Sequence, residues 1–174
     1  MSIQFVFGTP IWHFTDSDPE ICKQAYDWAL SVRKAVPGVV RSNRGGYQSD
    51  DSNNFKELPF TEHIMQRLYP LPNFKLMNWW LNVNEPGNYN LGHVHPNCDL
   101  SVVWYITDNH GTLTMDNPFA FNRYRLIKAM DDEFMLRFEC KAGDIIVFPS
   151  DIYHHVQENE TDETRISVAI NLEM

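Results

Sequence analysis

The sequence is poor in features that define several common classes of protein. Its three cysteines, Cys22, Cys98 and Cys140, lie far apart and form no CxxC pair. This pattern excludes a disulfide-stabilised scaffold and a zinc ribbon, and it indicates reduced thiols. No apolar run approaches the roughly 20 residues of a membrane-spanning helix. Met1 is followed by SIQFVFGTPIW, which lacks the charged start and apolar core of a signal peptide, so we expect a soluble, cytoplasmic protein.

Positive charge is also scarce. The 174 residues include 14 Lys or Arg against 23 Asp or Glu, which gives a formal net charge of -9. Binding to a nucleic-acid backbone requires clustered basic residues, so this balance argues against a nucleic acid as the main partner. The composition is 43% hydrophobic and 13% aromatic, which is typical of a globular domain with a substantial core.

The chain has no internal repeat and no linker rich in Gly, Ser or Pro, so we expect a single domain over residues 1–174. Its first part, about residues 1–73, shows helical and loop patterns, whereas about 74–174 is a succession of short strand-like runs. This order predicts a mainly β fold with flanking helices, built on a double-stranded β-helix, the jelly roll that cupins use.

The expected local elements are two helices and a series of strands. Ser17 is the expected N-cap of the first helix, whose apolar positions from Ile21 to Val32 recur at helical spacing. A second, shorter helix is expected to begin at Thr61 and to end before Pro70. Residues 41–54 are expected to form a loop. The expected strands are 3–7, 75–84, 100–107, 111–115, 124–130, 134–143, 144–150 and 165–174.

Histidines gather in two short segments of the strand-rich part. In GHVHP, His93 and His95 lie two residues apart on a strand and therefore point to one face. Asp99 follows after a turn, from which a carboxylate can return to the same end of the fold. In FPSDIYHH, His154 follows an apolar strand that Pro149 ends. Several imidazoles without a thiolate predict a transition-metal site, with zinc, iron, manganese, nickel and copper all open at this point.

A basic residue and a hydroxyl share one face of the last strand. Arg165 and Ser167 are two residues apart and come shortly after His154. A guanidinium is a planar fork that suits bidentate binding of a carboxylate. A buried Arg without a partner is costly, so we expect either a protein acid or a bound ligand beside it. Next to a histidine metal site, the ligand is the favoured interpretation.

Five segments carry a resemblance to a known family: SNRGGYQSD (42–50), WLNVNEPGNYNLGHVHP (80–96), LSVVWYI (100–106), VFPSDIYHHV (147–156) and RISVAIN (165–171). Together they resemble the 2-oxoglutarate and iron(II)-dependent oxygenases, in particular small oxygenases of bacteria and bacteriophages. In that superfamily a proximal HxD/E motif and a distal His hold iron, and a following Arg-x-Ser binds the far carboxylate of 2-oxoglutarate. The resemblance implies iron ligation by His93 and His154 and 2-oxoglutarate binding by Arg165 and Ser167.

One position departs from the superfamily pattern. His95 stands where the proximal motif usually has Asp or Glu. Either Asp99 supplies the carboxylate after the turn, as a Glu does in the similar cupin pattern, or histidines and water hold the iron, as in aspartyl/asparaginyl β-hydroxylase-like enzymes. The expected metal ligands are therefore His93, His95, His154 and Asp99.

Two further residues are expected beside the cosubstrate. The resemblance places the polar side chain of Asn82 next to 2-oxoglutarate, and Tyr105 is a candidate hydroxyl inside the barrel. Trp79, Trp80 and Trp104 are interpreted as packing residues.

The resemblance implies a non-haem Fe(II), 2-oxoglutarate-dependent dioxygenase. Such an enzyme uses O2 and hydroxylates a C–H bond of a small-molecule or peptide substrate, with release of succinate and CO2. An exposed edge strand leaves a homodimer open. Two alternatives also stay open: a cupin-type isomerase or epimerase that uses its metal as a Lewis acid, and a non-catalytic, metal-stabilised binding module.

Overall fold

The computed structural model describes residues 8–15, 18–71, 73–118 and 135–174, and strands dominate the second half of this part of the chain. In chain order the elements are β1 (Trp12–Phe14), α1 (Pro19–Ala35), β2 (Asn43–Arg44), β3 (Tyr47–Gln48), the 3-10 helix η1 (Phe55–Glu57), α2 (Thr61–Leu68), β4 (Lys75–Asn84), β5 (Tyr89–His93), β6 (Leu100–Tyr105), β7 (Leu113–Asp116), β8 (Met135–Phe138), β9 (Ile145–Pro149), β10 (His154–Val156) and β11 (Arg165–Glu173).

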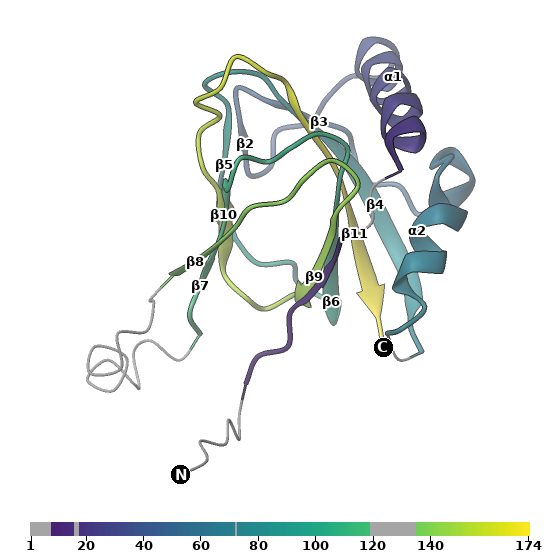
Figure 1. Ribbon diagram of the computed structural model, residues 1–174, viewed down its shortest axis with the longest axis vertical. Coiled ribbons are helices and arrows are strands. Elements are labelled where there is room, and N and C mark those ends of the chain that lie inside the picture. Colours follow the sequence, from purple (N-terminus) through teal and green to yellow (C-terminus); the bar gives the residue numbers. More distant parts are fainter. Residues whose placement is uncertain (1–7, 16–17, 72, 119–134) are drawn as a thin grey trace.

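The strands form two antiparallel sheets that face each other (Figure 1). The six-stranded sheet has the order β1-β9-β6-β11-β4-β3, and the five-stranded sheet has the order β2-β5-β10-β7-β8. From β4 onward the chain crosses from one sheet to the other at almost every connection, which is the winding of a jelly roll. The predicted fold class, mainly β with flanking helices and a double-stranded β-helix core, is confirmed.

Two apolar clusters hold the layers together. The larger joins Ala25 of α1 and Ile64 of α2 to one face of the six-stranded sheet, including Leu81 of β4. The smaller fills part of the space between the sheets and includes Met115 of β7 and Phe148 of β9. The two helices therefore cover the outer face of the six-stranded sheet (Figure 1) and leave its inner face to the space between the sheets.

The first helix begins one residue later than predicted. Its N-cap is Asp18, not Ser17: the Asp18 Oδ1 accepts hydrogen bonds from two backbone N–H groups of the first turn at 3.0 and 3.2 Å. Pro19 occupies the first helical position, where its missing N–H breaks no helical hydrogen bond. Ser17 itself and the strands predicted at 3–7 and 124–130 lie outside the described residues. Within the described ranges, neither helix combines the length and apolar character that crossing a membrane requires.

Residues 41–54 were expected to be a loop, but they contribute a short strand to each sheet. β2 pairs with β5, and β3 pairs with β4. Gly45 lies between them with a φ of 76°, a left-handed conformation that glycine adopts without steric cost. The Asn43 side chain donates to the carbonyl oxygens of Val39 and Gly46 at 3.1 and 2.7 Å, which braces the turn. This segment therefore reaches both sheets at one end of the barrel.

β11 lies inside the six-stranded sheet and sets the positions of several candidate residues. It pairs with β4 on one side and with β6 on the other. Ser167 lies opposite Asn82 of β4 and Tyr105 of β6, and Arg165 lies opposite Asn84. Because directly paired residues share a face and alternate residues of a strand do too, these side chains form adjacent rows on the inner face of the sheet.

Candidate metal centre

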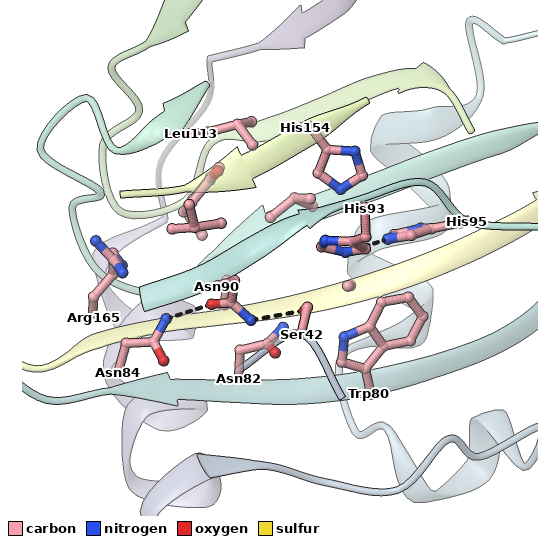
Figure 2. A pocket seen from close by; sticks show the side chains of 15 residues that line it. Ser42, Trp80, Asn82, Asn84, Asn90, His93, His95, Leu113, His154 and Arg165 are labelled. Carbon is pink, nitrogen blue, oxygen red and sulfur yellow. Dashed lines mark hydrogen bonds between the residues drawn. The ribbon is translucent and has the colours of Figure 1, made fainter. Parts of the chain in front are cut away.

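Three histidine side chains meet between the two sheets. His93 closes β5 and lies opposite His154, the first residue of β10. His95 comes just after β5, and the centroid of its ring is 5.1 Å from that of His93 and 5.0 Å from that of His154. One potential ligand atom of each histidine lies within 4.8 Å of the other two. Figure 2 shows the three rings gathered at one end of a pocket.

Hydrogen bonds determine which nitrogen of two of these rings carries a proton. His93 Nδ1 lies 2.7 Å from the Leu91 carbonyl oxygen, and His154 Nδ1 lies 2.9 Å from the Ile152 carbonyl oxygen. A carbonyl oxygen only accepts, so Nδ1 donates in both rings. Nε2 keeps a free lone pair in each, which is the tautomer that a metal-bound imidazole requires.

His95 is held in the same tautomer by side chains. Its Nδ1 lies 2.9 Å from Asn171 Oδ1, which only accepts, and 2.7 Å from Ser101 Oγ. Its Nε2 lies 3.2 Å from His93 Nε2. With metal–nitrogen bonds of about 2.0–2.1 Å, neighbouring ligands of one ion are about 3.0–3.4 Å apart. The observed spacing therefore fits joint coordination of a single metal ion.

Burial keeps these rings neutral. Loss of contact with solvent lowers the pKa of His93, lowers the pKa of His95 to about 4 and lowers the pKa of His154 to about 3. Removal from water disfavours the charged imidazolium in each case. At neutral pH a metal ion would meet three unprotonated Nε2 atoms and would have no proton to displace from them.

The structure does not bring Asp99 into this group. Its side chain is exposed, and its Oδ2 accepts a hydrogen bond from the backbone N–H of Met174 at 2.7 Å. Its own backbone N–H donates to the Leu172 carbonyl oxygen at 2.9 Å, so Asp99 is attached to the end of β11. Among the described residues, no carboxylate is grouped with the three histidines.

We expect the variant Asn171→Ala to bind metal about 10- to 100-fold more weakly, because His95 loses the acceptor that orients its ring. Titration of the apo protein with Ni(II) or anaerobic Fe(II) measures the affinity. Asn78→Ala is the matched control, since Asn78 lies opposite Asn171 on β4 but donates to Asp51 at 3.1 Å. Equal losses in the two variants would show that Asn171 acts only through the sheet.

A buried cation, Arg165, lies at the other end of the pocket. Arg165 is 4% exposed, and its Nη2 donates to the carbonyl oxygens of Gln157 and Asn88 at 3.2 and 3.5 Å. Its Nη1 is buried and has no hydrogen-bond partner in the described part of the chain. Burial lowers the pKa of Arg165 to about 10, which leaves it charged at neutral pH. Within the described ranges, no carboxylate forms an ion pair with it.

Such a buried guanidinium suits an anionic ligand. An unpaired buried charge lowers stability unless a partner supplies the missing interactions. The planar group matches the two oxygens of a carboxylate. The pocket therefore has a candidate metal site at one end and a candidate carboxylate site at the other (Figure 2).

The four residues expected beside the cosubstrate line this same pocket. Arg165 and Ser167 come from β11, Asn82 from β4 and Tyr105 from β6. Tyr105 is 4% exposed, and burial raises the pKa of its hydroxyl, which stays protonated as a potential donor. The structure thus brings these four residues together with His93, His95 and His154, and leaves Asp99 outside.

The sequence interpretation missed part of the lining. Trp80, interpreted as a packing residue, lines the pocket and meets His95 edge-on with ring centroids 5.1 Å apart. Asn84 donates to Asn90 at 3.0 Å, and Asn90 donates to Ser42 at 3.1 Å, which forms a chain of hydrogen bonds along one wall (Figure 2). The two-residue alternation of β4 around Asn82 points to Trp80 and Asn84, whereas no local signal marks Ser42 or Asn90.

Fold and geometry together define the class as a double-stranded β-helix protein with three clustered histidines inside its barrel. A family model described as "Putative 2OG-Fe(II) oxygenase" matches residues 78–171. The chain therefore belongs to the 2OG-Fe(II) oxygenase family, whose cofactors are Fe(II) and 2-oxoglutarate. The resemblance seen in the sequence is confirmed. No curated protein matches the sequence at a significant level.

Several solved structures share the fold. The epimerase SnoN from nogalamycin biosynthesis, crystallised with Fe3+, α-ketoglutarate and nogalamycin RO, is 16% identical with a TM-score of 0.71 over 95% of this chain and 79% of its own. A prolyl-4-hydroxylase from Pseudomonas putida is 14% identical with a TM-score of 0.65 over 95% and 92%. HygX from Streptomyces hygroscopicus, crystallised with nickel and 2-oxoglutarate, is 10% identical with a TM-score of 0.65 over 95% and 83%. At these identities the likeness establishes the fold.

Proposed function

We propose that this protein is an Fe(II)- and 2-oxoglutarate-dependent hydroxylase in which His93, His95 and His154 hold the iron. Arg165 and Ser167 bind the distal carboxylate of 2-oxoglutarate. The observation that carries the proposal is Arg165 Nη1, a buried donor to which no described residue offers an acceptor, in the same pocket as three histidines with free Nε2 lone pairs. Imidazoles suit iron, and a guanidinium suits a carboxylate, so the residues fit both groups.

The residues of the chain act by positioning and by excluding water. When bound, iron(II) and 2-oxoglutarate supply the oxidising chemistry, which consumes O2, hydroxylates a C–H bond and releases succinate and CO2. Arg165 and Asn171, which orients His95, lie on the same strand, so β11 fixes the carboxylate site relative to the histidines. Trp80 and Phe148 pack edge-on against His95 and His154 and keep water from those sides of the rings.

Three neutral ligands leave the 2+ charge of the metal without a protein counter-charge. A dianionic cosubstrate cancels that charge, and a buried site gains strongly from such neutralisation. We therefore expect metal and 2-oxoglutarate each to bind at least about 10-fold more tightly in the presence of the other, a coupling of about 1.4 kcal/mol. Co(II) titrations with and without saturating 2-oxoglutarate measure it. The same metal affinity in both titrations would contradict binding of 2-oxoglutarate at the metal.

We place the substrate in an open groove beside the histidines. The groove shares Ser42, Trp80, His93 and His95 with the pocket but includes neither Arg165 nor Ser167. A substrate bound there reaches the metal without displacing 2-oxoglutarate. Most of the remaining lining is polar, from Arg41, Gln48, Asp51, Asn78, Asn97 and Asn171. This surface suits a polar small molecule or a peptide, which are the substrate classes that the family implies.

Succinate formation tests the proposal. The full chain is incubated in air with Fe(II), ascorbate and 2-oxoglutarate, first alone and then with panels of polar metabolites and peptides. We expect slow succinate release alone and faster release with a substrate that gains one oxygen atom. A product of unchanged mass and altered configuration would show that the reaction is epimerisation and not hydroxylation. Retained metal binding with neither 2-oxoglutarate binding nor succinate would overturn the proposal.

A further inference from the structure

A second group of metal-binding side chains lies outside the pocket and the groove. His13 belongs to β1, Cys140 follows β8 and Asp144 directly precedes β9. One potential ligand atom of each lies within 4.8 Å of the other two, and His13 Nε2 is 3.1 Å from Asp144 Oδ2. We propose that His13, Cys140 and Asp144 form a second site, separate from the iron, for a divalent metal ion of the zinc type.

The donor set selects the kind of metal. A thiolate, an imidazole and a carboxylate are the three ligand types of protein-bound zinc, whereas calcium and magnesium require oxygen ligands. With metal–ligand bonds of about 2.0–2.3 Å, tetrahedral ligand atoms are about 3.3–3.8 Å apart. His13 Nε2 and Asp144 Oδ2, 3.1 Å apart, are already near that spacing, and the 4.8 Å limit on the other pairs leaves it within reach of side-chain rotation. A water molecule supplies the fourth ligand, since the His13 side chain is 35% exposed and leaves one side of the site open.

Charge balance favours a metal at this position. Cys140 is fully buried and Asp144 is 6% exposed. Binding releases the thiol proton to solvent and moves the His13 ring proton from Nε2, which faces Asp144, to Nδ1. The thiolate and carboxylate then cancel the 2+ charge of the ion, so the buried site becomes neutral. The three-histidine cluster differs in this respect, because its ligands are neutral and the 2+ charge of the metal is balanced by the cosubstrate.

Hydrogen bonds hold the ligands in place before a metal arrives. The Cys140 backbone N–H donates to Asn109 Oδ1 at 2.8 Å, and the Asn109 backbone N–H donates back to the Cys140 carbonyl oxygen at 3.0 Å. Asp144 Oδ2 accepts from the backbone N–H of Lys141 at 2.9 Å. His13 lies opposite Ile146 in the pairing of β1 with β9. A metal at this position links the edge strand β1 to the turn that leads into β9. We therefore expect the metal to stabilise the fold.

A His–Asp ion pair alone accounts for two of the three residues but not for the sulfur. The test therefore reads sulfur coordination directly. The reduced, metal-free full chain is titrated with Co(II) without 2-oxoglutarate, and the near-ultraviolet thiolate-to-cobalt charge-transfer band is recorded. The three-histidine cluster contains no sulfur, so it gives no such band and the readout is independent of oxygenase activity. We expect the band to appear and to saturate by two equivalents of Co(II) in the wild type, because the three-histidine cluster also binds the ion, and by one equivalent in His154→Ala.

Four variants assign the band. Cys140→Ser should abolish it, His13→Ala should weaken its apparent affinity at least about 10-fold, and His154→Ala should retain it. His110→Ala is the matched control, because His110 has similar exposure and a carboxylate at 3.6 Å, from Glu163, but belongs to no such group among the described residues. Absence of the band in the wild-type chain, its persistence in Cys140→Ser, or an unchanged affinity in His13→Ala would overturn the second site even if the oxygenase proposal holds.

Discussion

Replacing Arg165 by alanine should raise the dissociation constant of 2-oxoglutarate by about 100-fold or more and leave the metal content unchanged. Truncating one partner of a buried, hydrogen-bonded charge pair costs about 2–5 kcal/mol, which corresponds to factors of about 30 to several thousand. Arg165 would form such a pair with 2-oxoglutarate, since it is 4% exposed and its Nη1 has no hydrogen-bond partner among the described residues. Calorimetric titration of the metal-loaded protein with 2-oxoglutarate measures the change, and metal analysis of the same samples gives the second readout.

Two comparisons separate binding from a structural role. Arg165→Lys keeps a charge but loses the planar fork, so it should recover only part of the affinity. Arg41→Ala is the control, since Arg41 lines the open groove and its side chain is 59% exposed. In the absence of 2-oxoglutarate, Arg165→Met should unfold at the same temperature as the wild type or higher, because it removes an unpaired buried charge. Parallel losses of metal, cosubstrate affinity and thermal stability would make Arg165 a structural residue.

The barrel was predictable because its main strands carry their own signals. β4, β6, β9 and β11 are apolar runs bounded by turn residues, and each was expected close to its observed position. β2 and β3 were missed, because each has only two residues and forms only through pairing with a distant strand. The N-cap was misplaced by one residue because Ser17 and Asp18 are both good capping types, and the position of Pro19 decides between them.

The site was predictable where it depends on residues within one strand, and less so where it depends on a turn. His93 and His154 end or begin strands that pair directly, so their motifs locate both. The choice between His95 and Asp99 depends on the direction of the chain after β5. Asn97 adopts a φ of 64° there, and Asp99 then pairs with the end of β11. Residue types alone do not specify that path, because Asn tolerates but does not require a left-handed conformation.

For a similar reason, local sequence patterns could not predict which residues form the hydrogen-bonded wall of the pocket. Asn84 and Asn90 are six residues apart on consecutive strands, and Ser42 joins them from a segment far back in the chain. Their side chains meet because β2 lies at the edge beside β5, a pairing that only the folded barrel creates. Polar residues in such positions resemble ordinary loop composition until the pairing is known.

His154→Ala should reduce metal affinity by more than about 100-fold, a larger loss than the removal of a residue that only orients a ligand. His154 is 4% exposed, and its Nδ1 hydrogen bond to the Ile152 carbonyl oxygen aims Nε2 at the other rings. Phe148 and His93 pack against the ring, so no other side chain is poised to replace it among the described residues. Metal affinity is measured by competition with a chelator of known affinity, with far-ultraviolet circular dichroism to verify folding.

The same measurement on His95→Ala and Asp99→Asn identifies the third ligand. We expect the metal affinity of His95→Ala to fall nearly as far as that of His154→Ala. The metal affinity of Asp99→Asn should stay within about twofold of the wild-type value, since substitutions at exposed positions rarely cost more than about 0.5 kcal/mol. Asp99→Asn keeps the shape of the side chain and an oxygen that can still accept from Met174, so it removes the charge alone. A large loss in Asp99→Asn with little change in His95→Ala would instead show a carboxylate shell reached by rearrangement of the turn after β5. That shell would halve the positive charge left at the metal, and the coupling between metal and 2-oxoglutarate would weaken with it.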